Sequence, residues 1–86
     1  MNRKEALKLL RGGKEGIEEW NRRRKTDEKI PSLHCANLCR ADLRYCSLHN
    51  ANLCRADLRY CSLHDADLTG GDLREANLRE ADLSGA

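Results

Sequence analysis

A leucine stands at every fifth position from Leu33 to Leu83, and this repeat constrains the fold more than any other feature of the chain. Self-similarity at a fixed period is typical of stacked structural units. A small residue stands two positions before each leucine, except at Pro31, and Ser, Asn or Asp stands directly before it. The repeated leucines are Leu33, Leu38, Leu43, Leu48, Leu53, Leu58, Leu63, Leu68, Leu73, Leu78 and Leu83.

A period of five fits neither a regular helix nor a regular strand. An α-helix turns about 100° per residue, so leucines five positions apart would spiral around it. Side chains of a strand alternate between two faces, so an odd period would send successive leucines to opposite sides. A chain that bends once in each pentad turns every leucine inward and buries it by stacking one coil on the next. The pattern therefore predicts a solenoid.

The length of one coil has two possible values, three pentads or four. Residues 32–46 and 47–61 are identical at all but one position, which favours a three-sided coil with one copy of this segment in each turn. Such a coil would stack Asp42, Asp57 and Asp72 in one column. Like charges directly opposite one another destabilise a sheet, so this arrangement is disfavoured.

A four-sided coil of four pentads removes that conflict, because no Asp then lies over another Asp. It also sets Arg55 over Glu75 and Arg40 over Tyr60. We therefore expect four pentads in each coil. The two copies of the three-pentad segment then begin on different sides of the coil.

The pentads ADLRY, ANLCR, ADLTG, GDLRE, ANLRE and ADLSG resemble the pentapeptide repeat family, whose pattern is A(D/N)LXX. The resemblance implies an all-β solenoid: a right-handed four-sided β-helix of about 11 repeats over residues 31–86. It also implies that some members imitate DNA and bind type II topoisomerases such as gyrase. The leucines expected in the core are Leu38, Leu43, Leu48, Leu53, Leu58, Leu63, Leu68, Leu73 and Leu78.

The segment 1–30 lacks the repeat and predicts a short α-helical cap. Apolar spacing indicates helices over residues 3–11 and 14–25, separated by two glycines. An open solenoid end exposes leucines and unpaired backbone groups, which a cap covers. We expect Ile17 and Trp20 to pack on the first coil. The segment around Trp20 is similar to leader segments of cyanobacterial pentapeptide repeat proteins.

The five cysteines divide by their place in the pentad. Cys46 and Cys61 occupy the small inward position and are expected to be inert core residues, whereas Cys35, Cys39 and Cys54 follow leucines and should face water. An odd number of cysteines without a signal peptide or an apolar span predicts free thiols and a cytoplasmic location.

One cluster of side chains has the chemistry of a soft metal site. With four pentads in each coil, His34 lies over Cys54, and Cys35 is adjacent to both. Two thiols and an imidazole would suit zinc, although these are also ordinary variable surface positions. The same proximity would permit a disulfide between Cys35 and Cys54 under oxidising conditions. No other metal or cofactor site is expected.

Charge is unevenly divided: residues 1–31 contain 10 basic and 6 acidic side chains, and residues 32–86 contain 6 and 8. The basic run at residues 22–25 could contact phosphates, but it also suits the C-terminal end of a helix. No aromatic side chains interleave with it to stack on bases, so nucleic acid binding is not expected.

The sequence shows neither a nucleophile paired with a base nor a glycine-rich phosphate loop, so we do not expect an enzyme. We expect a structural or protein-interaction module with an unidentified protein partner. The alternatives are a DNA mimic that binds a topoisomerase, or a Cys/His metal-binding protein. The final coil has no cap in the sequence, so we also expect a weak homodimer through this C-terminal coil.

Overall fold

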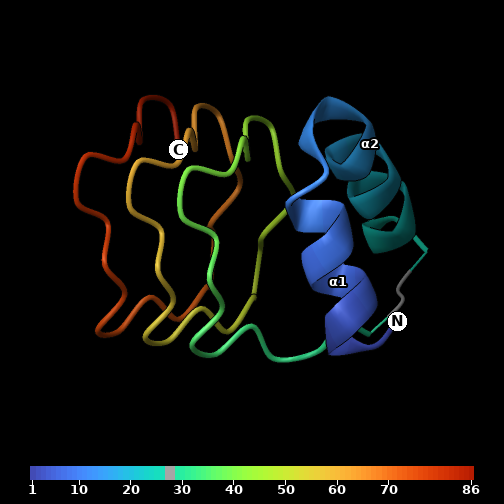
Figure 1. Ribbon diagram of the computed structural model, residues 1–86. Helices are drawn as coiled ribbons and strands as arrows, with labels where there is room; N and C mark the ends of the chain where they lie inside the picture. Colours follow the sequence, from blue (N-terminus) through green and yellow to red (C-terminus); the bar gives the residue numbers. More distant parts are fainter. Residues whose placement is uncertain (27–28) are drawn as a thin grey trace.

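The molecule has two parts, a pair of packed helices and a stack of coils that extends away from them (Figure 1). The computed structural model describes residues 1–26 and 29–86, so residues 27–28 of the predicted cap lie outside the described residues. The molecule is 31 Å along its longest axis and 21 Å across the other two. The helices cover one end of the stack.

Helix α1 spans Arg3–Leu10 and helix α2 spans Gly13–Arg24. The side chain of Asn2 caps α1, since its Oδ1 accepts the backbone N–H of Glu5 at 2.8 Å. Three arginines in the last turn of α2 place positive charge where the helix dipole is negative. Both helices begin and end within one residue of the ranges that the sequence predicts.

A glycine allows the two helices to pack closely. A Cβ on Gly16 would lie 2.1 Å from the carbonyl oxygen of Leu9, so only glycine fits there without a shift of the backbone. Ile17 and Trp20 of α2 are buried, and they belong to the same core cluster as the leucines of the first coil. The helices and the coils therefore share one core.

The coils are joined by parallel bridges between residues four pentads apart in the sequence. This spacing agrees with the coil length that the charge columns predict, and no bridge among the described residues joins positions three pentads apart. The bridged pairs are Asn37 with Asp57, Asp42 with Ser62, Ser47 with Asp67, Asn52 with Asp72, Asp57 with Asn77, and Ser62 with Asp82.

The expectation of an all-β solenoid is met only in part. Two α-helices are present, and over residues 1–26 and 29–86 the repeat forms isolated bridges rather than continuous strands. The reason is the bend in each pentad, which leaves one bridged residue per side where ordinary strands have about five or six residues.

Backbone hydrogen bonds between coils follow a fixed pattern. The N–H of Leu38 donates to the carbonyl of Asp57 at 2.9 Å, and the N–H of Asp57 donates back to the carbonyl of Ala36 at 2.8 Å. The same two contacts recur along the stack, so each coil is held to the next by main-chain groups.

A tight turn follows each leucine. At the first turn the N–H of Ala36 donates to the carbonyl of Leu33 at 3.0 Å, while Cys35 has a φ of 59°. Nine of the described non-glycine residues adopt this left-handed conformation, which is uncommon for bulky side chains. The polar residue before the leucine offsets part of the strain. For example, Asn37 Oδ1 accepts the N–H of Cys39 at 3.1 Å.

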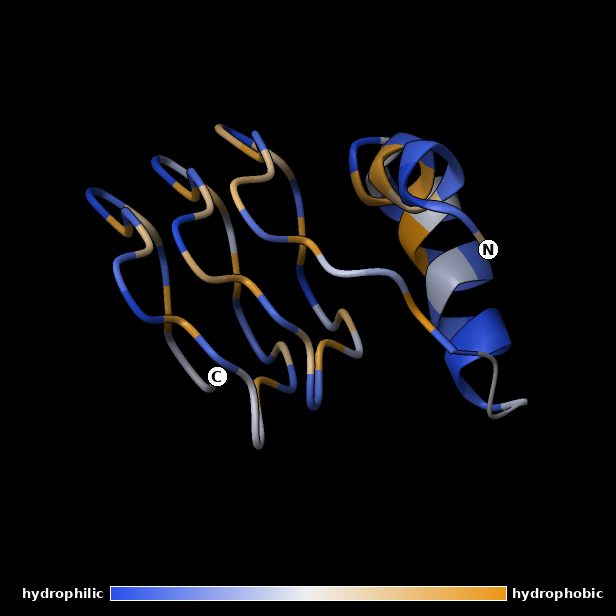
Figure 2. Cartoon of the chain, turned by 90° about the horizontal axis from the view of Figure 1, so that it is seen from below, coloured by the Kyte–Doolittle hydropathy of each residue, from blue (hydrophilic) through white to orange (hydrophobic). Residues whose placement is uncertain are grey.

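Hydrophobic residues recur at regular intervals along every coil (Figure 2). The leucines from Leu33 to Leu63 are buried, whereas Leu68, Leu73 and Leu78 are half-buried and Leu83 is 42% exposed. The core is therefore complete beside the helices and becomes thinner toward the other end of the stack.

Candidate protein-interaction surfaces

Two arginines of the helical cap satisfy carbonyl groups at the edge of the first coil. Arg3 donates to the carbonyls of Ser32 and His34, each at 2.7 Å. Arg11 donates to the carbonyl of Asn37 through Nε at 2.9 Å and Nη2 at 2.7 Å. In the coils that follow, the equivalent carbonyls accept N–H groups from the preceding coil. The arginines therefore take the place of a preceding coil.

Trp20 and Asn21 form hydrogen bonds with backbone groups on another side of the first coil. Trp20 Nε1 donates to the carbonyl of Ser47 at 2.9 Å. The Asn21 amide donates to the carbonyl of Tyr45 at 2.9 Å and accepts the N–H of Ser47 at 2.8 Å. The cap thus covers the first coil with hydrogen bonds as well as with apolar surface.

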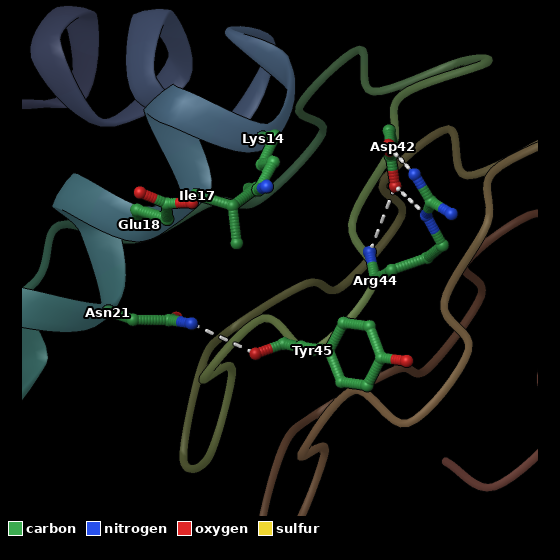
Figure 3. A pocket seen from close by; sticks show the side chains of 7 residues that line it. All are labelled: Lys14, Ile17, Glu18, Asn21, Asp42, Arg44 and Tyr45. Atoms are coloured by element: carbon green, nitrogen blue, oxygen red, sulfur yellow. Dashed lines mark hydrogen bonds and ion pairs between the residues drawn. The ribbon is translucent and has the colours of Figure 1, made fainter.

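A cavity of about 330 Å³ lies between α2 and the first coil (Figure 3). Ile17 and the ring of Tyr45 supply its apolar part, while charged groups from both elements surround them. Tyr45 is 62% exposed, and its ring meets the ring of His64 edge-on at 5.8 Å. The lining residues are Lys14, Ile17, Glu18, Asn21, Asp42, Arg44 and Tyr45.

Arg44 forms a two-pronged ion pair with Asp42 at one side of this cavity. Its Nε lies 2.8 Å from Asp42 Oδ1 and its Nη2 lies 2.7 Å from Oδ2. These hydrogen bonds lower the pKa of Asp42 and raise that of Arg44. The same fork joins Asp57 to Arg59 and Asp72 to Arg74. Because the forks recur every three pentads around a coil of four, each lies on a different side.

Two contacts between neighbouring coils match the predicted columns. Arg55 Nε lies 2.7 Å from Glu75 Oε2, and the Arg40 guanidinium lies 4.5 Å from the centre of the Tyr60 ring. Both are exposed contacts, so each contributes little to stability. They show instead that the coil length sets which side chains meet.

The cysteines fall into an inner and an outer group. Cys46 and Cys61 are buried. Burial raises the pKa of the Cys46 thiol to about 12, and it also raises the pKa of the Cys61 thiol. Cys35 is exposed, and Cys39 and Cys54 are half-buried. All five are free thiols.

The predicted cluster of His34, Cys35 and Cys54 is brought together only in part. Cys35 Sγ lies 3.4 Å from His34 Nε2, and its backbone N–H donates to the carbonyl of Cys54 at 2.9 Å. Yet nowhere in residues 1–26 and 29–86 do three potential ligands converge as a metal ion requires. The candidate zinc site is therefore corrected: in register, Cys35 lies over Arg55, so the two thiols do not converge with the imidazole on one point.

The end of the stack away from the helices has an open edge, formed by residues 67–86. A hollow of about 670 Å³ here is lined by four leucines, by small residues and by Asp65, Asp67 and Thr69. Among the described residues, the N–H groups of Leu68, Leu73, Leu78 and Leu83 have no backbone acceptor, unlike those of the earlier leucines. Apolar surface and unpaired main-chain groups therefore coincide at this edge.

The family model for pentapeptide repeats matches residues 32–59 and 61–86, with eight copies. The chain belongs to the pentapeptide repeat family. Comparison with curated proteins returns no match. Membership identifies a repeat protein with a structural or interaction role, and it is typical of proteins that are not enzymes.

Most side chains of the basic run at residues 22–25 already form ion pairs or hydrogen bonds within the molecule. Arg22 and Arg23 pair with Glu19, and Arg23 also pairs with Glu5. Arg24 donates from Nη2 to the carbonyl of His49. Most of these cations are therefore already paired before any phosphate could approach. In the described part of the chain, neither helix has the length and apolar character needed to cross a membrane.

Sequence reasoning missed two features of the pentapeptide repeat surface. The roles of Arg3 and Arg11 have no signal in the sequence, because an arginine that reaches a backbone edge looks the same as a solvated one. The cavity beside Tyr45 depends on the angle at which α2 lies on the coil, which residue spacing does not define. Only the exposed position of Tyr45 in its pentad could have been a hint.

Proposed function

We propose that this chain is a non-enzymatic pentapeptide repeat module, a right-handed four-sided β-helix whose side faces bind another protein. The observation that carries the proposal is that the coils are locked to one another by main-chain hydrogen bonds. The outward side chains therefore project from positions that lose little conformational freedom on binding. Five free thiols support a reducing compartment such as the cytoplasm.

The surface that best suits a partner is the cavity between α2 and the first coil. Tyr45 is exposed beside Ile17, and Lys14 and Glu18 face the same cavity without an ion pair of their own among the described residues. Tyrosine is enriched where proteins bind one another, because it offers apolar area with one polar end. Arg44 adds a charged group beside it.

Capture from a native lysate with matched variants tests this function. Immobilised wild-type protein should retain a protein that Tyr45→Ala does not retain. Tyr60→Ala is the control, because Tyr60 occupies the same place in the duplicated segment but lies outside the cavity. Equal retention by all three forms would place the binding surface elsewhere, and no specific retention by any form would contradict the module.

The DNA-mimic alternative has less support. A mimic needs free carboxylates arranged like phosphates, whereas Asp42, Asp57 and Asp72 each form a fork with an arginine two positions further along the chain. Of the eight acidic side chains in residues 32–86, these three are compensated by forks and Glu75 pairs with Arg55. We expect no inhibition in a gyrase supercoiling assay, and inhibition at a protein concentration near that of the enzyme would revive this alternative.

A second copy of the chain is the partner that best suits the open edge. We propose a weak homodimer in which two such edges meet about a two-fold axis, because a self-complementary contact of this kind ends assembly at two copies. The half-buried leucines and the unpaired N–H groups would then be covered together. The edge is small, so affinity should be low.

A further inference from the structure

We propose that Cys35 and Cys54 form a thiol pair that is oxidised by hydroperoxides, with His34 activating Cys35 and Cys54 closing a disulfide between the first two coils. The chemistry is separate from the proposed partner binding, because it uses a different side of the stack from the cavity beside Tyr45.

The first observation is the contact between Cys35 and His34. The thiol sulfur lies 3.4 Å from Nε2, so the imidazole can accept the thiol proton directly. Cys35 is also exposed, which gives a small oxidant free access. Thiolate rather than thiol is the nucleophile, so a thiol with a base in contact and open to solvent is the reactive kind.

The second observation is the position of Cys54. It follows Leu53 in the next coil, and its carbonyl accepts the N–H of Cys35 at 2.9 Å. Adjacent hydrogen-bonded chains lie about 4.8 Å apart. Cys54 stands one residue before the position in register with Cys35, and consecutive Cα atoms are about 3.8 Å apart, so the two Cα atoms are about 6 Å apart. This lies within the range of about 4.4–6.8 Å that a disulfide needs.

The third observation is the cation beside both thiols. Arg55 follows Cys54 in the chain and lies in register over the position of Cys35. Cys54, His34 and Arg55 line one surface hollow. Glu75 holds the Arg55 side chain at 2.7 Å, which fixes the guanidinium in place.

The reaction proceeds in two balanced steps. His34 takes the proton of Cys35, and the thiolate attacks one oxygen of hydrogen peroxide. A sulfur–oxygen bond forms, the oxygen–oxygen bond breaks, and the leaving hydroxide takes the proton from His34 and departs as water. The Cys54 thiol then attacks the sulfenic sulfur of Cys35, the sulfur–sulfur bond forms, and the sulfenic hydroxyl leaves with the Cys54 proton as a second water. The two thiols are oxidised by two electrons, and the peroxide is reduced by two.

The other thiols lack this arrangement. Cys46 and Cys61 are buried. Cys39 is half-buried, and among the described residues no imidazole contacts it. The duplicated segment provides a natural comparison, because His49 corresponds to His34 but is followed by Asn50 in place of Cys35.

Mass spectrometry after brief treatment of the reduced protein with hydrogen peroxide tests the proposal. We expect a loss of two hydrogens per chain and one linked peptide that joins Cys35 to Cys54, both reversed by dithiothreitol. In Cys54→Ser the reaction should stop at a sulfenic acid on Cys35, which dimedone traps. His34→Gln should slow the loss of the Cys35 thiol about tenfold or more.

The matched control is His49→Gln, which should leave the rate of Cys35 oxidation unchanged. Thermal unfolding of each reduced variant confirms that the fold is retained before the rates are compared. Three results would each overturn the proposal: oxidation of Cys39 as fast as that of Cys35, a rate unaffected by His34→Gln, or a disulfide that does not join Cys35 to Cys54.

Discussion

Leu58 lies in the middle of the stack, with a coil on each side and no exposed surface. Replacing it with alanine removes buried apolar atoms and leaves a cavity that the main-chain ladder prevents from closing. We expect Leu58→Ala to lower the free energy of unfolding by about 2–5 kcal/mol. Chemical denaturation measures the change.

Leu83→Ala is the comparison, because Leu83 is 42% exposed and its removal leaves little cavity. Its effect should be much smaller than that of Leu58→Ala. Equal effects of the two substitutions would show that burial of the leucines does not follow the gradient along the stack.

The thiols give a second prediction for single residues. Alkylation for a short time at neutral pH should label Cys35, Cys39 and Cys54 and leave Cys46 and Cys61 unlabelled, because burial excludes the reagent and raises the pKa of the two inner thiols. Peptide mapping measures each site. Labelling of Cys46 as fast as Cys39 in folded protein would contradict the inward position.

The aspartate forks make stability depend on pH. The hydrogen bonds from Arg59 lower the pKa of Asp57 in the folded state, below the value of about 3.9 that an aspartate has in an unfolded chain. The stabilisation is therefore present above that value and is lost as pH falls through the folded pKa. We expect the melting temperature to fall over this acid range, and to fall less in Arg59→Gln.

Arg79→Gln is the control for the fork. Arg79 occupies the same place in its pentad, but Asn77 stands where the fork has an aspartate. This variant should keep the pH dependence of the wild type. If the melting temperature depended less on pH in Arg79→Gln than in Arg59→Gln, the pH dependence would come from a group other than the Asp57–Arg59 fork.

At the scale of elements, Gly16 decides how closely α1 and α2 pack. Alanine is the better helix former, so propensity alone predicts a gain of up to about 1 kcal/mol from Gly16→Ala. We expect a loss instead, because the new Cβ would lie 2.1 Å from a backbone oxygen of α1. Thermal unfolding decides the sign. Glu15→Ala, at an exposed position beside it, should change stability little.

Residue patterns predicted some elements well and others poorly, for physical reasons. The leucine period predicted which side chains turn inward, and the avoidance of stacked Asp42 and Asp57 predicted bridges between positions four pentads apart. The all-β expectation held only in part, because two α-helices are present and the bend in each pentad leaves isolated bridges rather than strands. The hydrogen bonds from Arg3 and Arg11 to the first coil were missed, since only the position of α1 brings them there.

At the scale of the whole molecule, the open edge predicts a concentration-dependent assembly. Light scattering over a concentration series should show a dimer in the wild type at high concentration. Leu83→Lys places a charge in the contact and should remain a monomer. A wild type that is monomeric at millimolar concentration would contradict the homodimer, as would a Leu83→Lys variant that dimerises equally well.

The mismatch between a duplicated segment of three pentads and a coil of four has a consequence for how such a chain can lengthen. One extra copy of the segment advances the chain by three sides of four, so every following face is displaced by a quarter of a revolution. Successive duplications thus place copies of the same side chains on successive faces around the axis. Growth by the three-pentad segment moves given side chains to a different face of the stack. Growth by whole coils would extend each face and leave its side chains on the same side.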